Sequence, residues 1–380
     1  MNCTGIIAEY NPFHKGHEYH VSKTRSFAKD NFVIALMSGN FVQRGDIAIY
    51  NKFYRAQKAL EAGVDMVWEL PAAFSVSCAE KFAKAAVLIF EKSGVVDKLS
   101  FGSECGDINN LFEIAGNSLS CNEEAKARFK ESLKTGISFA RAQSEALSLP
   151  SSPNDVLGLE YIKAIKEFNA KITPIAIQRI GAMHDSTDST LDGFQSASTI
   201  RNLILDGKLD SPVIPASSQS SEFSSMMLYV LRSMSQDEFA LLPDVSEGLQ
   251  HVLYEACREA TSYADFLALS KSKRYTMARL RRIAICALLR IEEKLQDNAL
   301  VSPNDYLYIK VLGMRKEASP ILSELSKRSE IPIIISHSDT TKLSPQAKAL
   351  LEKDLLSSDI YNILSKQKAF SDYTQPLIVV

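Results

Sequence analysis

The sequence predicts an α/β protein, with a Rossmann-like parallel sheet in its first part and a mainly helical C-terminal domain. Short apolar runs alternate with stretches of helical spacing along the first half, which is typical of a parallel sheet with crossover helices. The chain has 380 residues, of which 46% are hydrophobic. Because single cores usually stop growing near about 250 to 300 residues, we expect more than one domain.

The expected elements alternate along the chain. Ile6 to Ala8 forms the first strand, and Asn11-Pro12 marks the turn after it because proline cannot donate to the ladder. The other predicted strands are buried apolar runs at Phe32–Met37, Met66–Leu70, Lys98–Phe101 and Ile172–Ile177. The predicted helices span Lys52–Ala62, Ala79–Lys92, Asn122–Lys134 and Asp155–Phe168. In such open sheets, ligands bind beyond the carboxyl ends of the strands.

A stretch rich in serine and proline, residues 210–221, is expected to be a linker. It divides the chain into a domain with the sheet, residues 1–209, and a helical domain, residues 222–380.

Composition narrows the class of protein. A formal net charge of -2 excludes a globally basic nucleic-acid binder, although it leaves room for a local basic patch. No stretch approaches the ~20 apolar residues of a membrane span, and the N-terminus lacks a signal pattern, so we expect a cytoplasmic protein without a membrane partner. Six scattered cysteines without a Cys-x-x-Cys pair indicate reduced thiols.

A His14-x-Gly16-His17 motif follows the first strand and its turn. Gly16 lets the backbone approach an anion, and the next helix would point free amides at phosphate oxygens. Two alternatives stay open. With His20, the two histidines would share one helix face and could hold a metal, but no Cys, Asp or Glu completes a ligand set nearby. They could also be purely structural. We favour binding of nucleotide phosphates, with His14 and His17 as the catalytic pair.

Polar clusters also follow the later strands. Asn40, Gln43 and Arg44 lie in a glycine-bounded loop that could grip a carboxylate or a phosphate, chiefly through Gln43 and Arg44, or be an ordinary surface loop. Gly102 would let a base or ribose approach the backbone, and Asn154 is either a helix cap or a ligand-facing amide. Beyond the fifth strand lie Arg179 and then His184 and Asp185. A predicted helix start follows at Ser196, with Arg201 one turn in, and it is either an anion site or a plain N-cap.

A basic segment lies in the second half. From Phe266 to Arg290 the chain has seven basic residues and no acidic one. The apolar stripe of the predicted helix contains Leu280, Ile283, Ala284, Ala287 and Leu288, and Arg282 should lie opposite it. This face is either merely solvated or an RNA surface, and Tyr275 for stacking favours RNA. The expected RNA contacts are Lys273, Arg274, Arg279, Arg281, Arg282 and Arg315.

The chain resembles a known family over nearly its whole length. His14-x-Gly16-His17 with the later Ser196-x-Ser198-x-Ile200-Arg201 is similar to the nucleotidyltransferase superfamily. One branch matches more closely, the bacterial tRNA(Met) cytidine acetate ligases. The segments that carry this resemblance are residues 7–14, Met37–Gly45, Trp68–Pro71, Phe101–Glu104, Asn154–Gly158, Arg179–Gly181, Lys273–Thr276, Arg281-Arg282 and Val311–Gly313.

The resemblance implies a two-step reaction. Acetate and ATP would form acetyl-adenylate, and the acetyl group would then move to N4 of the wobble cytidine of elongator tRNA(Met). We expect Mg²⁺ to accompany the triphosphate, held by phosphate oxygens and water rather than by protein ligands. No stable protein partner is implied. The implied ATP site contains Ile7, Ala8, Glu9, Tyr10, Asn11, Pro12, Phe13, His14, Lys15, Gly16, His17, His20, Gly102, Asn154 and Arg179, and we add Ser196 and Arg201.

Two departures from the family pattern concern Asn51, where an acidic residue is common, and a shorter segment at 181–185. Two other functions remain open at this point. A small-molecule adenylyltransferase would use the same phosphate site without the basic helix, and a non-catalytic RNA-binding protein would need only the helix.

Overall fold

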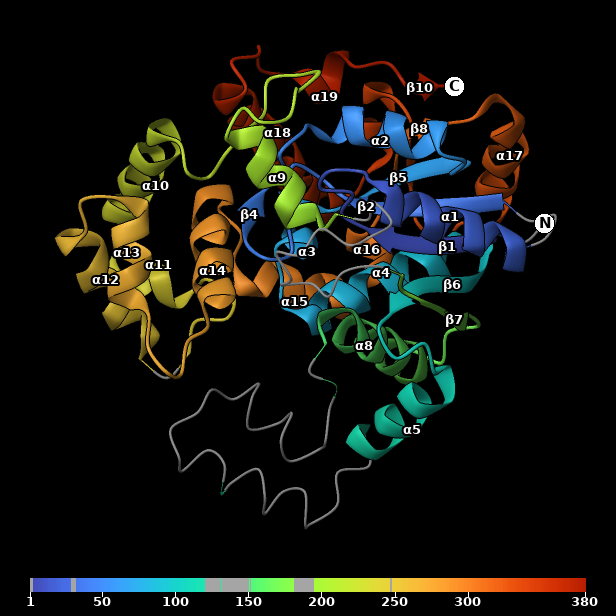
Figure 1. Cartoon of the computed structure of the whole chain (residues 1–380), viewed down its shortest axis with the longest axis horizontal. Coiled ribbons are helices and arrows are strands. Elements are labelled where there is room, and N and C mark those ends of the chain that lie inside the picture. The colour runs from blue at the N-terminus through green and yellow to red at the C-terminus, as the bar shows by residue number, and fades with distance from the viewer. Residues whose placement is uncertain are drawn as a thin grey trace.

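The protein is described from a computed structural model of the whole chain (Figure 1). The structure describes residues 3–28, 32–119, 131, 150, 152–180, 195–246 and 248–380. The predicted helix Asn122–Lys134, apart from position 131, and the predicted cluster at His184 and Asp185 lie outside these residues.

Within the described residues, one mixed sheet has the strand order β10-β8-β5-β2-β1-β6-β7, and β9 pairs with β8. Five neighbouring strands, β5, β2, β1, β6 and β7, are mutually parallel, which confirms the predicted parallel sheet. Ser38 pairs with Leu70, and Ser103 with Gln178, so these strands end at one carboxyl edge. The bounds are β1 (Cys3–Ala8), β2 (Phe32–Ser38), β5 (Met66–Leu70), β6 (Val96–Ser103) and β7 (Thr173–Gln178).

Helices cover both faces of this sheet. On one face, α1 and α2 bury Val21, Ala56 and Leu60 against Val33 and Val67. On the other, α4 and α8 pack around the large side chains of the sheet, and the ring centroids of Trp68 and Phe90 lie 5.9 Å apart. The helices of this part are α1 (Lys15–Ala28), α2 (Lys52–Glu61), α3 (Ala72–Ser75), α4 (Ala79–Ser93), α5 (Ile108–Leu119), α8 (Pro153–Glu167) and α9 (Ala197–Leu205).

A cluster of helices stands beside the sheet, on the left of Figure 1. The chain reaches it through residues 206–220, which form neither helix nor strand and contain most of the expected linker. Its members are α10 (Ser221–Ser233), α11 (Gln236–Ala240), α12 (Leu249–Glu259), α13 (Tyr263–Ser270) and α14 (Met277–Leu289). The helices α15 (Glu293–Val301) and α16 (Pro303–Tyr306) lead back towards the sheet.

The C-terminal part departs from the expected division. Strand β8 (Ile309–Met314) runs antiparallel to β5, with Val311 opposite Trp68. Residues 309–380 therefore complete the sheet of the N-terminal part, and the expected range 222–380 is not one helical unit apart from it. The other elements here are η1 (Lys316–Ala318), α17 (Ser319–Arg328), β9 (Ile333–Ile334), η2 (His337–Lys342), α18 (Pro345–Leu364), α19 (Ser371–Thr374) and β10 (Ile378–Val379). Among the described helices, none is both long and apolar enough to cross a membrane.

Candidate active site

The histidine motif forms the turn between β1 and α1, at the carboxyl edge of the sheet. The carbonyl of His14 accepts hydrogen bonds from the amides of His17 and Glu18 (2.8 and 3.1 Å), so the helix starts beside it. The amide of Gly16 donates to Nδ1 of His14 (3.0 Å). A Cβ at position 16 would lie only 2.8 Å from Cε1 of that ring, which explains the need for glycine.

The hydrogen bonds fix the tautomers of both motif histidines. Nδ1 of His14 accepts from Gly16, and Nδ1 of His17 accepts from the amide of His14 (3.3 Å). A neutral imidazole then carries its proton on Nε2. Burial and the nearby Arg179 and Arg201 lower the pKa of His14 to about 4. Burial and His14 hold the pKa of His17 well below its ordinary value. The stacked pair, with ring centroids 3.9 Å apart, therefore offers two neutral N–H donors at pH 7.

His20 points elsewhere. Its Nε2 lies 3.0 Å from Oγ of Ser100 on β6, which also contacts Oγ1 of Thr24 (2.7 Å). The three histidines thus do not converge on one point, and the described residues contain no group of three or more His, Cys, Asp or Glu placed to hold a metal. We infer that His20 anchors α1 to the sheet.

The end of β6 and the start of α8 form one wall of the site. Helix α8 begins at Pro153 with Ser152 as its N-cap, so Asn154 is not the cap. The side-chain amide of Asn154 donates instead to Oε1 of Glu104. Arg179 lies across Gly102, 3.4 Å from where a Cβ would stand, and its Nε is 3.9 Å from the same Glu104 oxygen. The side chain of Arg179 remains 43% exposed and available to a ligand.

Asp155, which was not predicted as a site residue, holds the end of β6 and the start of α8 together. Its carboxylate accepts from the hydroxyls of Ser103 and Ser152 and from the amides of Glu104 and Cys105. Burial raises the pKa of Asp155, but these hydrogen bonds outweigh it and leave the pKa below its ordinary value. The sequence signal for Asp155 is its place directly after Asn154, but only Asn154 was predicted to face a ligand.

Helix α9 closes the site from the other side. Oγ of Ser196 accepts from the amide of Thr199 (3.1 Å), so Ser196 is the N-cap. Arg201, one turn into the helix, donates from Nη1 to the carbonyl of Asn11 (2.7 Å). The helix start and its arginine therefore stand against the histidine turn, as an anion site requires.

The glycine-bounded loop is a small hairpin, β3 (Phe41–Val42) and β4 (Asp46–Ile47). Asn40 is buried, accepts from the amide of Lys52 (2.9 Å) and donates to Ser358 (3.2 Å), so the expectation that it grips a ligand is wrong. Nε2 of Gln43 donates to the carbonyl of Ser77 (3.2 Å). Arg44, in the turn of the hairpin, is exposed.

A second residue that the sequence analysis missed is Arg55. Its buried guanidinium donates to the carbonyls of Tyr50 (2.9 Å) and Ser38 (3.1 Å), and also to those of Glu9 and Gly39. It therefore ties the carboxyl ends of β1 and β2 together. Asn51, the departure from the family pattern, caps α2 by accepting from the amide of Tyr54 (2.8 Å).

The predicted RNA residues separate into two kinds. The apolar stripe of α14 is buried as predicted. Arg279 donates to the carbonyl of Asp244 (2.8 Å) and to Ser246 (2.9 Å), and Arg282 pairs with the Asp244 carboxylate at 3.4 Å. The expectation that Arg282 points to solvent is wrong, because its side chain is only 13% exposed, and Tyr275 is buried too.

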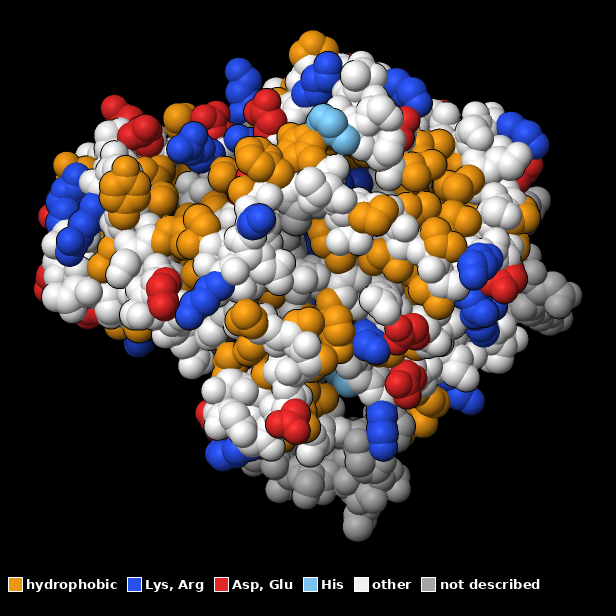
Figure 2. All heavy atoms as spheres, turned by 90° about the horizontal axis from the view of Figure 1, so that it is seen from above, with side chains coloured by type: hydrophobic (Ala, Val, Ile, Leu, Met, Phe, Trp, Pro, Cys, Tyr) orange, Lys and Arg blue, Asp and Glu red, His pale blue; other side chains and the backbone are white. Residues whose placement is uncertain are grey.

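The remaining basic residues are more accessible. Lys273 and Arg274 precede α14 and are exposed, whereas Arg281 is half-buried. Arg315 follows β8 and donates its amide to the carbonyl of Asp65, which precedes β5. Since β8 is antiparallel to β5, Arg315 lies at the opposite edge of the sheet from the histidine turn. On the face seen from above in Figure 2, Lys and Arg side chains are scattered and do not form one basic area.

Gly45 connects the hairpin to the basic helix. It has φ +72°, and a Cβ there would lie 2.4 Å from the backbone nitrogen of Arg282 and 2.6 Å from the carbonyl carbon of Arg281. The hairpin and α14 therefore touch backbone to backbone. The basic helix lies close to the candidate site in space, although it is far from it along the chain.

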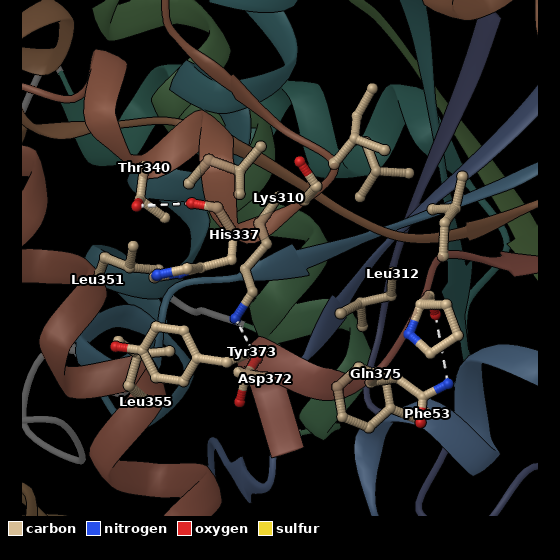
Figure 3. Close-up of a pocket in the computed structure, with 16 residues that line it drawn as sticks. Phe53, Lys310, Leu312, His337, Thr340, Leu351, Leu355, Asp372, Tyr373 and Gln375 are labelled. Atoms are coloured by element: carbon tan, nitrogen blue, oxygen red, sulfur yellow. Dashed lines mark hydrogen bonds and ion pairs between the residues drawn. The ribbon is translucent and has the colours of Figure 1, made fainter. Parts of the chain in front are cut away.

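A buried ion network lies near the carboxyl end of β5. Nζ of Lys52 lies 2.8 Å from Glu69 and 2.7 Å from Asp372, and Nζ of Lys310 lies 2.8 Å from Glu69. Lys310 and Asp372 also line a pocket of about 50 Å³ with His337, Thr340 and Tyr373 (Figure 3). None of the predicted ATP residues lines this pocket, so it is not the candidate nucleotide site.

Comparison with known proteins agrees with this geometry. The sequence model of a family described as HIGH Nucleotidyl Transferase matches residues 1–375. The tRNA(Met) cytidine acetate ligase of Thermoanaerobacter sp. (strain X514) is 37% identical over 100% of both chains, and that of Clostridium kluyveri (strain ATCC 8527) is 36% identical over 100% of this chain and 99% of its own.

Two solved structures of Thermotoga maritima TmcAL have the same fold over the full length of both chains. The apo form I matches with a TM-score of 0.91 and 30% identity, and form II, bound with alpha-thio ATP, with 0.88 and 29%. This chain therefore belongs to the HIGH nucleotidyl transferases and, within them, to the tRNA(Met) cytidine acetate ligase family.

Proposed function

We propose that the protein activates acetate with ATP and transfers the acetyl group to N4 of the wobble cytidine of elongator tRNA(Met). The observation that carries this proposal is the convergence of anion-binding groups at one strand edge. The neutral pair of His14 and His17, the start of α9 and the arginines Arg179 and Arg201 all meet there. We place the reaction in the cytoplasm, with its tRNA substrate.

The chemistry explains why ATP is needed. The lone pair on the exocyclic amine of cytosine is delocalised into the ring, so the amine is a poor nucleophile and free acetate would not acylate it. In the first step, acetate attacks the α-phosphorus and pyrophosphate leaves. Groups that donate to the phosphate oxygens stabilise the charge that develops, and positioning supplies much of the remaining acceleration.

Each group has a role in that first step. Nε2–H of His14 and of His17 would donate to phosphate oxygens, and Arg179 and Arg201 would neutralise their charge. Arg44 is the candidate contact for acetate or phosphate from the hairpin. Mg²⁺ would enter with the triphosphate as part of the substrate. The carboxylates of Glu104 and Asp155 already accept several hydrogen bonds, so neither is an open metal ligand.

In the second step, tRNA must bring its wobble base to the acetyl-adenylate. Lys273 and Arg274, exposed before α14, are the candidate contacts for tRNA phosphates, and Gly45 connects that helix to the hairpin. We propose that the base enters between the hairpin and the histidine turn.

Incorporation of labelled pyrophosphate into ATP tests the first step. Exchange that depends on acetate is expected, and its absence with every carboxylate tried would contradict the ligase. Exchange with a nucleotide in place of acetate would indicate a small-molecule adenylyltransferase. Mass analysis of nucleosides from tRNA incubated with ATP and acetate tests the second step, and N4-acetylcytidine in elongator tRNA(Met) is the expected product.

A further inference from the structure

Glu9, which the family resemblance places in the ATP site, carries a carboxyl group to which the proposed activation step assigns no chemical role. It directly follows β1, and its carboxyl oxygen Oε1 accepts the amide of Gln43 from the hairpin at 2.9 Å. Among the described residues, no hydrogen bond to its second oxygen is present. One oxygen of Glu9 is therefore held in place, and the other can take a further partner.

The groups around Glu9 come from four different elements. Arg44 on the hairpin, Arg201 on α9 and Arg55 on α2 act on it as cations, and Tyr161 on α8 lies near it as a buried phenol. Burial raises the pKa of Glu9 above its ordinary value, and the hydrogen bond from Gln43 and these arginines oppose that effect. A carboxylate with a raised pKa is a stronger base than an exposed one.

Acetyl transfer needs such a base. As N4 of cytidine attacks the acetyl carbon, the nitrogen becomes acidic and must lose a proton. Resting on the ligase reaction proposed above, we propose that Glu9 is the general base that accepts this N4 proton. The C–N bond forms, the bond from the acetyl carbon to the phosphate oxygen breaks, and AMP leaves with that electron pair. Glu9 then returns the proton to solvent.

The other groups in the site are poorly suited to this task. Burial lowers the pKa of both motif histidines so far that they are weak bases, and each uses Nδ1 to accept a backbone amide. Glu104 accepts from Asn154 and from the amide of Asp155. Asp155 is held by four donors.

The test compares the two steps in Glu9→Gln, which keeps the shape of the side chain and removes the base. Acetate-dependent pyrophosphate exchange should fall far less than transfer does, because acetate is already ionised and its activation needs no base. Acetyl transfer to elongator tRNA(Met), measured in a single turnover, should fall by about 10²-fold or more. In the wild type, the rate of transfer should rise with pH through the pKa of Glu9 and then level off, and this rise should be absent in Glu9→Gln.

Two further variants complete the design. Glu9→Asp keeps a carboxylate, so it should transfer slowly but retain the rise with pH. Asp46→Asn removes another negative charge that acts on Arg201, from β4 of the same hairpin, and should leave both steps and the pH profile unchanged.

The outcomes separate this inference from the proposed function. Wild-type acetate exchange with an unchanged pH profile of transfer in Glu9→Gln would overturn Glu9 as the base and leave the ligase intact. An equal loss of exchange and transfer in that variant would overturn it too, because Glu9 would then serve activation or folding. Absence of acetate-dependent exchange in the wild type would instead contradict the proposed ligase function itself.

Discussion

The arginines of the strand edge and those of helix α14 are used differently. At the strand edge, hydrogen bonds to backbone carbonyls orient Arg55 and Arg201, and within the described residues neither forms an ion pair with a carboxylate, although Glu9 lies near both. On α14, Arg282 pairs with an acid, and Arg279 is bound to the loop that carries this acid. The arginines of the first region are thus held by the backbone, while the charges of Arg279 and Arg282 in the second are bound to a loop that carries an acid.

The largest effect expected from this comparison is on the histidine turn. His17→Ala removes a neutral donor that we propose contacts the phosphates, and it should lower acetate-dependent pyrophosphate exchange by about 10² to 10³-fold, as for the loss of other transition-state donors. Binding of tRNA should be unchanged. His251→Ala, on the exposed surface of α12, is the matched control and should have no effect. Wild-type exchange in a folded His17→Ala protein would exclude this role.

The next prediction concerns the close backbone contact between the hairpin and α14 at Gly45. Gly45→Ala adds a Cβ at φ +72° that would lie 2.4 Å from the backbone of α14, so it should lower the free energy of unfolding by more than about 2 kcal/mol. Gly207→Ala has a similar φ of +69° with nothing within 4 Å, and should cost only about 1 kcal/mol. Urea denaturation measures both. Equal losses would mean that the contact with α14 is not tight.

A third prediction sharpens the division among the basic residues. Lys273→Ala with Arg274→Ala should weaken tRNA binding and flatten the slope of log K against log salt by about 0.7 to 0.9 for each lost phosphate contact. Arg282→Ala should leave that slope unchanged and lower the melting temperature, because it leaves Asp244 without its partner. A flatter slope in Arg282→Ala would show that its ion pair opens for RNA.

The smallest effect concerns pH and stability. The folded-state pKa values of His14 and His20 are lowered to about 4, below the ordinary value of 6.5. The unfolded chain therefore binds more protons between these values, and the free energy of unfolding should fall as the pH falls from 6.5 to 4. His20→Gln should make this fall shallower in denaturation curves recorded across that range. An unchanged pH dependence would mean that His20 is not buried as a neutral group.

Local patterns were sufficient for the parallel part of the fold. The predicted runs from Phe32, Met66 and Lys98 lie in strands and the run from Ile172 begins one residue before β7, because apolar runs bounded by turn residues signal buried strands directly. Strand β8 was missed. Its apolar run is equally clear, but its partner β5 is far away in the sequence, and the linker before it suggested a separate domain.

The candidate site was predictable where its residues act through the backbone. The turn at His14 and the cap at Ser196 follow from local sequence. The partners of Asn40, Arg282 and Asn154 did not follow, because each hydrogen bond or ion pair joins distant parts of the chain. Residue type gives the charge of a side chain, but the fold decides whether that charge is already neutralised.

The buried ion network has a consequence for synthesis on the ribosome. Lys52 and Glu69 emerge early, whereas Lys310 and Asp372, which complete their pairing, emerge near the end. Lys52 and Glu69 can pair with each other at once, but β5 remains an open sheet edge until β8 is made, next to the strand ends of the candidate nucleotide site. The sheet of the first half therefore stays incomplete until residues 309–314 are made, and a chain truncated before β8 would expose an aggregation-prone edge at β5 rather than form a smaller working domain.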